Sequence, residues 1–270
     1  MIGAAWHCDS ALARLEIGPL AGSFCPTRPA DGLGEVFLAG GRWPAARLCG
    51  LVAGDCPNLR AAKMGLSPSC QSAASAPALV ECFCRRSALV TAYEHGTALQ
   101  VRWDALWRAI RPTGDDSFLA ALDLIVSVQT RLLDSRADLV VQSVLPATRA
   151  WRLEQTDPAQ FVGLVISPDT LTPIAGQWPS CVLVHGPGND WSYAEMVHPA
   201  DSAGDELTVA RSGSPGDAAL RLRHRLLWQP LEKGVILRAR VRGIFLPRQD
   251  DMRIAAACYR QFVVADPPLA

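Results

Sequence analysis

The sequence has no apolar run approaching the roughly 18 residues that a membrane-spanning helix needs. The segment Met1–Leu15 also lacks the basic stretch and the continuous apolar core of a signal peptide. Charged residues are scarce at 19%, and the 26 basic and 26 acidic side chains cancel, so no overall field draws the chain toward nucleic acid or an anionic membrane. We therefore expect a soluble, cytoplasmic protein with no nucleic-acid or membrane partner.

Familiar enzyme motifs are missing as well. The chain has no glycine-rich phosphate loop ending in Lys-Ser/Thr, no nucleophile elbow, no His-Glu-x-x-His motif and no dinucleotide fingerprint. We expect no cofactor, and the sequence favours a binding protein over an enzyme. An enzyme assembled from separate strand residues stays open as an alternative.

Cysteine is present without a pattern. The nine cysteines are an odd number, and their spacing does not repeat in the paired form that zinc sites use. We expect reduced thiols packed as small core residues, and no metal site.

The length and composition suit a well-packed core. A chain of 270 residues with 49% hydrophobic residues can bury about 70–75% of its unfolded surface. No low-complexity linker divides it, so we expect one β-sandwich domain over residues 1–270, in which residues 1–77 are partly irregular.

Beyond residue 77, apolar and polar residues alternate. Trp103 and Trp107 fall on one face of a strand, and Asp104 and Arg108 on the other. The stretch Phe118–Leu133 would also fit a buried helix, but its β-branched residues favour a strand. Many short strands with Gly and Pro between them, and no regularly interposed helices, predict an all-β fold, a large antiparallel β-sandwich of the supersandwich type.

Only the end of the chain has helical spacing. Apolar residues recur three and four positions apart at Met252, Ala255, Ala256, Tyr259, Phe262 and Val263. Asp250 or Asp251 can cap such a helix. The sequence therefore predicts a short C-terminal α-helix packed against the sandwich.

Two amphipathic segments, Leu220–Trp228 and Val235–Phe245, each alternate apolar residues with arginine. We expect them to pair as a hairpin, which places six guanidinium groups on one face, from Arg221, Arg223, Arg225, Arg238, Arg240 and Arg242. Because like charges repel across strands, either neighbouring carboxylates and solvent offset them, or the face binds an anion or an acidic partner. His224, on the apolar side, fits a hydrogen-bonded core histidine.

The segment Cys181–His198 predicts a second hairpin with its turn at Gly186–Asp190. If His185 lies opposite Trp191, one face carries an imidazole, two aromatic rings and a carboxylate, from His185, Trp191, Tyr193 and Glu195. Such a face suits a saccharide-like ligand, because rings cover its C–H groups while the polar groups bind its hydroxyls. The alternative is a half-exposed edge with Trp191 packed inward. A metal site that adds His198 would need a bulge, since His198 falls on the opposite face.

Three stretches carry a family resemblance: Asp123–Ser135 (DLIVSVQTRLLDS), Trp191–Pro199 (WSYAEMVHP) and Leu231–Arg248 (LEKGVILRARVRGIFLPR). Together they are similar to a bacterial family of unknown function found mainly in planctomycetes. The resemblance implies a largely β protein and supplies no activity or catalytic residue. Large sandwiches that bind or isomerise sugars, including the galactose-mutarotase-like fold, are an analogy at the level of the fold.

Three functions follow as hypotheses. The first is a protein that binds a saccharide-like or anionic small molecule. The second is a carbohydrate-active enzyme of mutarotase or lyase type, in which Glu195 and His185 converge on one sugar oxygen as base and acid. The third is an interaction module that docks an acidic partner on the arginine face. The sequence leaves the oligomeric state open.

Overall fold

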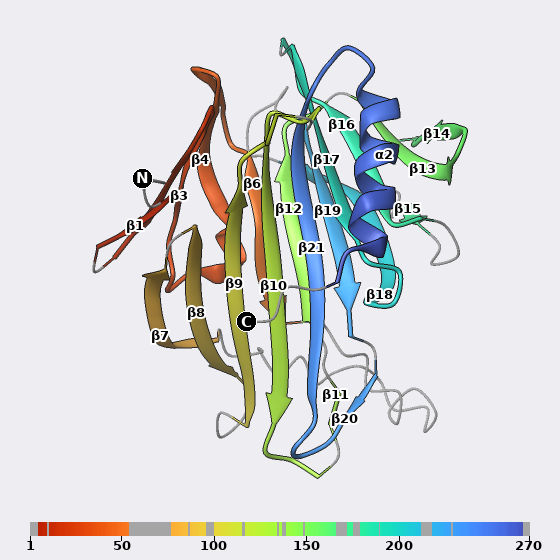
Figure 1. Ribbon diagram of the computed structural model, residues 1–270. Helices are drawn as coiled ribbons and strands as arrows, with labels where there is room; N and C mark the ends of the chain where they lie inside the picture. Colours follow the sequence, from red (N-terminus) through yellow and green to blue (C-terminus); the bar gives the residue numbers. More distant parts are fainter. Residues whose placement is uncertain are drawn as a thin grey trace.

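The computed structural model describes residues 5–9, 11–53, 77–85, 87–95, 100–114, 117–133, 135–136, 139–147, 149–165, 172–174, 179–188, 190–211, 218–227 and 229–266. Two large antiparallel sheets stack face to face, and one α-helix lies against the outside of one of them (Figure 1). The predicted antiparallel β-sandwich with a C-terminal helix is confirmed. Within the described ranges no helix is long and apolar enough to cross a membrane.

The first sheet has ten strands in the order β1-β2-β3-β4-β6-β12-β19-β18-β15, with β5 paired to β4. A short 3₁₀ helix, η1 (Pro29–Asp31), precedes β4. The strands are β1 (Trp6–Cys8), β2 (Ala13–Ile17), β3 (Leu20–Phe24), β4 (Leu33–Leu38), β5 (Gly41–Trp43), β6 (Arg47–Ala53), β12 (Leu139–Leu145), β15 (Thr172–Ile174), β18 (Ser202–Arg211) and β19 (Ala218–Leu226).

The second sheet has nine strands in the order β14-β13-β16-β17-β21-β10-β9-β8-β7. A separate two-stranded sheet pairs β11 (Ser135–Arg136) with β20 (Pro230–Leu231). The nine strands are β7 (Ala78–Arg85), β8 (Ala88–His95), β9 (Val101–Ile110), β10 (Ala120–Thr130), β13 (Arg149–Thr156), β14 (Ala159–Gly163), β16 (Cys181–His185), β17 (Trp191–Val197) and β21 (Ile236–Pro247).

The main core lies between the two sheets. Trp103 and Trp107 of β9 are buried, and they occupy the face that the alternation predicted. The ring of Trp107 packs on Phe24 from the first sheet, with the ring centroids 4.5 Å apart. The stretch Phe118–Leu133 contains strand β10, as the β-branched residues indicated.

The predicted arginine hairpin is wrong, because β19 belongs to the first sheet and β21 to the second. Strand β19 pairs with β12 and β18, whereas β21 pairs with β10 and β17. Strand β19 ends at Leu226 and β21 begins at Ile236, so the change of sheet falls between these two residues. The same apolar alternation fits two strands side by side in one sheet or two strands that face each other across a core, and here the second arrangement forms.

Helix α2 (Asp251–Val264) covers part of the outer face of the second sheet and builds a second, smaller core there. Its apolar side, including Ala255, Tyr259 and Phe262, packs on the outward residues of β13, β16, β17 and β21. Asp250 occupies the N-cap position, as predicted, but its side chain makes no capping hydrogen bond. Strand β17 is therefore buried on both faces.

Cys8 and Cys84 form a disulfide, which corrects the expectation that the thiols are reduced. The bond joins edge strand β1 of the first sheet to edge strand β7 of the second and closes that side of the sandwich. Sequence spacing could not show this pairing, because 76 positions separate the two cysteines. Among the other described cysteines, Cys25, Cys49, Cys82 and Cys181 are free thiols.

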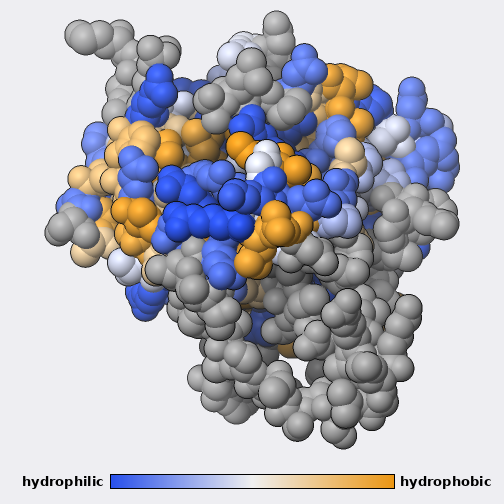
Figure 2. Space-filling model, turned by 90° about the horizontal axis from the view of Figure 1, so that it is seen from below, coloured by the Kyte–Doolittle hydropathy of each residue, from blue (hydrophilic) through white to orange (hydrophobic). Residues whose placement is uncertain are grey.

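Figure 2 shows one end of the sandwich, where hydrophilic side chains gather in the middle and hydrophobic ones lie in separate groups around them. Single exposed apolar side chains are normal on soluble domains. The described surface carries several large ones, at Phe37, Val80, Phe83, Leu133, Val162, Val165, Val235, Ile236 and Val264.

Candidate functional site

The β16–β17 hairpin forms as predicted, but its register differs by one residue from the pairing of His185 with Trp191. Val182 lies opposite Glu195, and Val184 opposite Tyr193. A shift of one residue moves a side chain to the other face of a sheet. Trp191, Tyr193 and Glu195 consequently point into the sandwich together, whereas His185 points outward, so the predicted group of four does not converge.

The two aromatic rings of that group fill the main core. Trp191 and Tyr193 are only 6% and 1% exposed, and both pack on Trp43 from the first sheet, with ring centroids 5.0 and 5.7 Å apart. Phe245 of β21 completes the cluster. The packing of Trp191 matches the alternative in which this residue is packed inward.

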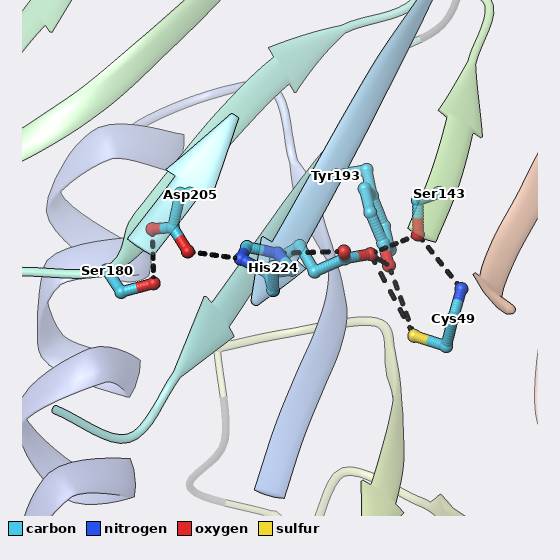
Figure 3. A network of polar contacts seen from close by, with 7 residues as sticks. Cys49, Ser143, Ser180, Tyr193, Asp205 and His224 are labelled. Carbon is cyan, nitrogen blue, oxygen red and sulfur yellow. Dashed lines mark hydrogen bonds and ion pairs between the residues drawn. The ribbon is translucent and has the colours of Figure 1, made fainter. Parts of the chain in front are cut away.

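A chain of hydrogen bonds around His224 crosses the main core (Figure 3). His224 Nδ1 lies 2.7 Å from Asp205, and Nε2 lies 3.0 Å from Oε1 of Glu195. Ser180 donates its hydroxyl to the other oxygen of Asp205 at 2.6 Å. Because Glu195 belongs to β17 and His224 to β19, this chain links the two sheets. The prediction of a hydrogen-bonded core histidine is confirmed.

The second carboxylate oxygen of Glu195 is equally well bonded. The hydroxyls of Ser143 and Tyr193 each donate to Oε2 at 2.6 Å, and the thiol of Cys49 lies 3.8 Å from the same oxygen. Ser143 and Cys49 come from β12 and β6 of the first sheet. All of these side chains are buried. We call the set Ser180, Asp205, His224, Glu195, Ser143, Tyr193 and Cys49 the buried network.

The absence of a side chain at Gly243 makes room for the buried network. Gly243 on β21 lies opposite Glu195, and a Cβ atom at position 243 would lie 2.2 Å from the hydroxyl of Tyr193. Only glycine therefore lets the phenol ring lie across β21 and reach the carboxylate of Glu195.

The buried network holds an imidazolium between two carboxylates. Burial alone would lower the pKa of His224, but Asp205 and Glu195 outweigh that effect and raise the pKa to about 10. Burial raises the pKa of Cys49 and of Tyr193 well above their usual values, so both keep their protons. Because every member of the buried network is buried, the network is suited to holding the two sheets together and is closed to a ligand.

A second polar cluster lies on the outer face of the second sheet, where β16 meets the start of helix α2. His185 Nε2 lies 2.8 Å from Oδ2 of Asp251, and Ser192 donates its hydroxyl to the same oxygen. Trp151 of β13 packs on the imidazole, with the ring centroids 4.3 Å apart and tilted by 55°. His198 contacts the carbonyl of Val263 at the other end of the helix. The three residues considered as metal ligands, His185, Glu195 and His198, therefore do not come together.

The same cluster adjoins a pocket. A pocket of about 490 Å³ lies at the amino-terminal end of helix α2, and its lining contains Ala159, Asp250, Asp251, Met252 and Arg253. Burial lowers the pKa of His185, so its imidazole is neutral at neutral pH. The neutral ring donates from Nε2 to the Asp251 carboxylate, which makes Nδ1 an acceptor. This pairing escaped the sequence analysis, since 66 residues separate the two partners.

The six arginines do not form one surface, which corrects the prediction. Arg223 and Arg225 lie on the outside of the first sheet and pair with Glu206 at 3.5 and 2.9 Å. Arg221 lies on the same face. The other three lie on the opposite side of the sandwich, outside the second sheet, where each has a different partner: Arg238 binds Ser127, Arg240 binds carbonyls at the end of α2, and Arg242 binds Asp123.

No family model and no curated protein matches the chain. Solved structures do share its architecture. A candidate aldose 1-epimerase from Escherichia coli K12 aligns over 87% of this chain and 98% of its own, with a TM-score of 0.58 and 11% identity. A candidate mutarotase from Salmonella typhimurium aligns over 90% and 93%, with a TM-score of 0.56 and 9% identity. At these identities the likeness shows the fold alone.

Proposed function

We propose that this protein binds a saccharide-like small molecule in the pocket at the amino-terminal end of helix α2. The observation that carries the proposal is the position of Asp251, which lines the pocket and also holds His185 beneath the Trp151 ring. The pocket volume lies within the range of about 300–1,000 Å³ usual for small-molecule sites.

The chemistry of the cluster suits a sugar. The carboxylates of Asp250 and Asp251 in the pocket lining accept hydrogen bonds from sugar hydroxyls, and the guanidinium of Arg253 donates to sugar oxygens. Trp151 and His185 are not among the lining residues; they pack on each other behind Asp251, and His185 holds the Asp251 carboxylate in place. A fold shared with structures named as an aldose 1-epimerase and a mutarotase supports the same ligand class.

Binding is favoured over the catalytic alternative. Glu195 and His185 lie on opposite faces of the second sheet, so they cannot act on one oxygen atom as base and acid. Glu195 is also engaged in the buried network by four side chains. The predicted pair of Glu195 and His185 is therefore not assembled around one site.

Replacement of His185 by alanine is expected to weaken the binding of D-galactose or D-glucose at least tenfold, because Asp251, which lines the pocket, loses the imidazole that fixes its carboxylate. Isothermal titration calorimetry of the wild type and the variant measures this change. The matched control is His7→Ala, since His7 is an exposed histidine on β1 of the other sheet. Equal affinities for the two variants, or heat signals that never saturate with a panel of neutral sugars, would contradict the proposal.

A further inference from the structure

On the outer face of the second sheet, two arginines bind the same carboxylate. Asp123 of β10 lies between Arg108 of β9 and Arg242 of β21 in the strand register. Arg242 binds both carboxylate oxygens, through Nε at 2.6 Å and Nη2 at 3.0 Å, and Nη2 of Arg108 lies 2.5 Å from Oδ2. Asp123 is wholly buried beneath these guanidinium groups.

Among the described residues of this face, the positive charges outnumber the carboxylates. Two guanidinium groups share the single charge of Asp123, and Arg240 beside them donates to neutral carbonyls at the end of α2, at 2.7 Å from Phe262 and 3.0 Å from Ala265. Asp201 is the other carboxylate within electrostatic range of Arg240. Three cations therefore face two anions at the centre of this face.

The same face continues along β21 and β9. Arg238 donates to the neutral hydroxyl of Ser127 at 3.1 Å, which adds one more positive charge. Arg102 is balanced by Asp104 at 2.8 Å, with Glu81 3.9 Å away. An anion that approaches this part of the sheet would thus meet a local excess of positive charge, although the whole chain has none.

Two features suit this face to an anionic ligand. The Nε atoms of Arg108 and Arg240 are buried and have no hydrogen-bond partner among the described residues, so the guanidinium donors here outnumber the acceptors that the described residues supply. The side chains of Arg108 and Arg242 are 30% and 19% exposed, so part of each side chain reaches solvent. Asp123 fixes both planar groups, and the ring of Phe262 lies 5.1 Å from the Arg242 guanidinium. Oriented guanidinium donors of this kind recognise planar and tetrahedral oxyanions.

We propose that Arg108 and Arg242, oriented by Asp123, form a second binding site, which takes the carboxylate or sulfate group of an acidic small molecule. It is separate from the sugar pocket. Arg240, the neighbour of this site, binds the carboxy-terminal end of helix α2, whereas the pocket lies at the amino-terminal end, and a helix of 14 residues spans about 21 Å. The proposal does not depend on the pocket.

The test compares inorganic sulfate and sodium glucuronate with sodium chloride at equal ionic strength, because screening by salt affects all three alike. We expect a saturable rise in the thermal midpoint of the wild type with sulfate or glucuronate and none with chloride. Tighter binding of glucuronate assigns the site to an acidic sugar, and tighter binding of sulfate assigns it to a free oxyanion. A response that does not saturate overturns the proposal.

Two variants sharpen the test. Arg108→Gln leaves the two-point contact of Arg242 with Asp123 intact, so the variant should fold, and its affinity for the anion should fall about tenfold. Arg223→Gln removes an arginine of similar exposure from the other side of the sandwich and should bind like the wild type. Equal affinity of Arg108→Gln and the wild type, with circular dichroism showing both folded, also overturns the proposal.

Discussion

Glu195→Ala is expected to lower the free energy of unfolding by about 3–5 kcal/mol, the usual loss when one partner of a buried charge pair is removed. In the variant the imidazolium of His224 keeps only Asp205, and the hydroxyls of Ser143 and Tyr193 lose their shared acceptor. Urea denaturation followed by circular dichroism measures the change as a shift of the midpoint at constant slope.

The control for this variant is Glu206→Ala. Glu206 also pairs with charged partners on β19, but it does so on the solvent side of the first sheet, where an ion pair contributes about 0–1 kcal/mol. If the free energy of unfolding falls by the same amount in both variants, the buried network does not hold the two sheets together.

The pH dependence gives a second readout of the same network. The pKa of His224 is raised from 6.5 to about 10 in the folded chain, so its contribution to stability is complete below about pH 6.5 and is lost as the pH rises through about 10. Glu195→Ala removes one of the carboxylates that raise this pKa. The decline of stability between these pH values should consequently be smaller in the variant than in the wild type.

Loss of the Cys8–Cys84 disulfide is expected to lower the free energy of unfolding by about 2–4 kcal/mol. The bond closes a long loop. In the unfolded state the crosslinked chain therefore has less conformational entropy than the open chain, which stabilises the folded state by comparison. The bond also ties together the edge strands of the two sheets. Thermal unfolding of the wild type with and without a reductant, and of the double variant Cys8→Ser, Cys84→Ser, measures the effect.

Cys25→Ser is the matched control, because Cys25 is a free and partly exposed cysteine directly after β3. We expect its midpoint to equal that of the wild type and to respond to the reductant in the same way. A double serine variant as stable as Cys25→Ser, or a wild type that is insensitive to the reductant, would show that the disulfide does not form.

The strands could be predicted from sequence, whereas the faces of β16 and β17 could not. Alternation placed β9 and β10 correctly, since each has apolar residues on its inner face and more polar ones outside. Strand β17 is buried on both sides, by the first sheet and by helix α2, so its residues carry no clear alternation. The register of β16 and β17 then depends on the turn, and an error of one residue moved His185 to the wrong face.

The sequence did contain a signal for the buried network. Glu195 lies among Trp191, Tyr193 and Val197, and His224 among leucines, so each inner face carries one ionisable residue. Buried charges require partners, and two such residues are the natural pair across a core. Recognising the pair required knowing that β17 and β19 face each other, which the predicted hairpin of β19 with β21 concealed.

We propose that a saccharide-like ligand binds outside the second sheet, at Asp251 and beside its partner His185, whereas Glu195 and His224 belong to the core. The most direct measurement is an NMR titration of the imidazole resonances of the labelled full chain with D-galactose. The resonances of His185 should shift and saturate, while those of His224 stay unchanged. Shifts at His224, or none at His185 up to saturating sugar, would contradict the account.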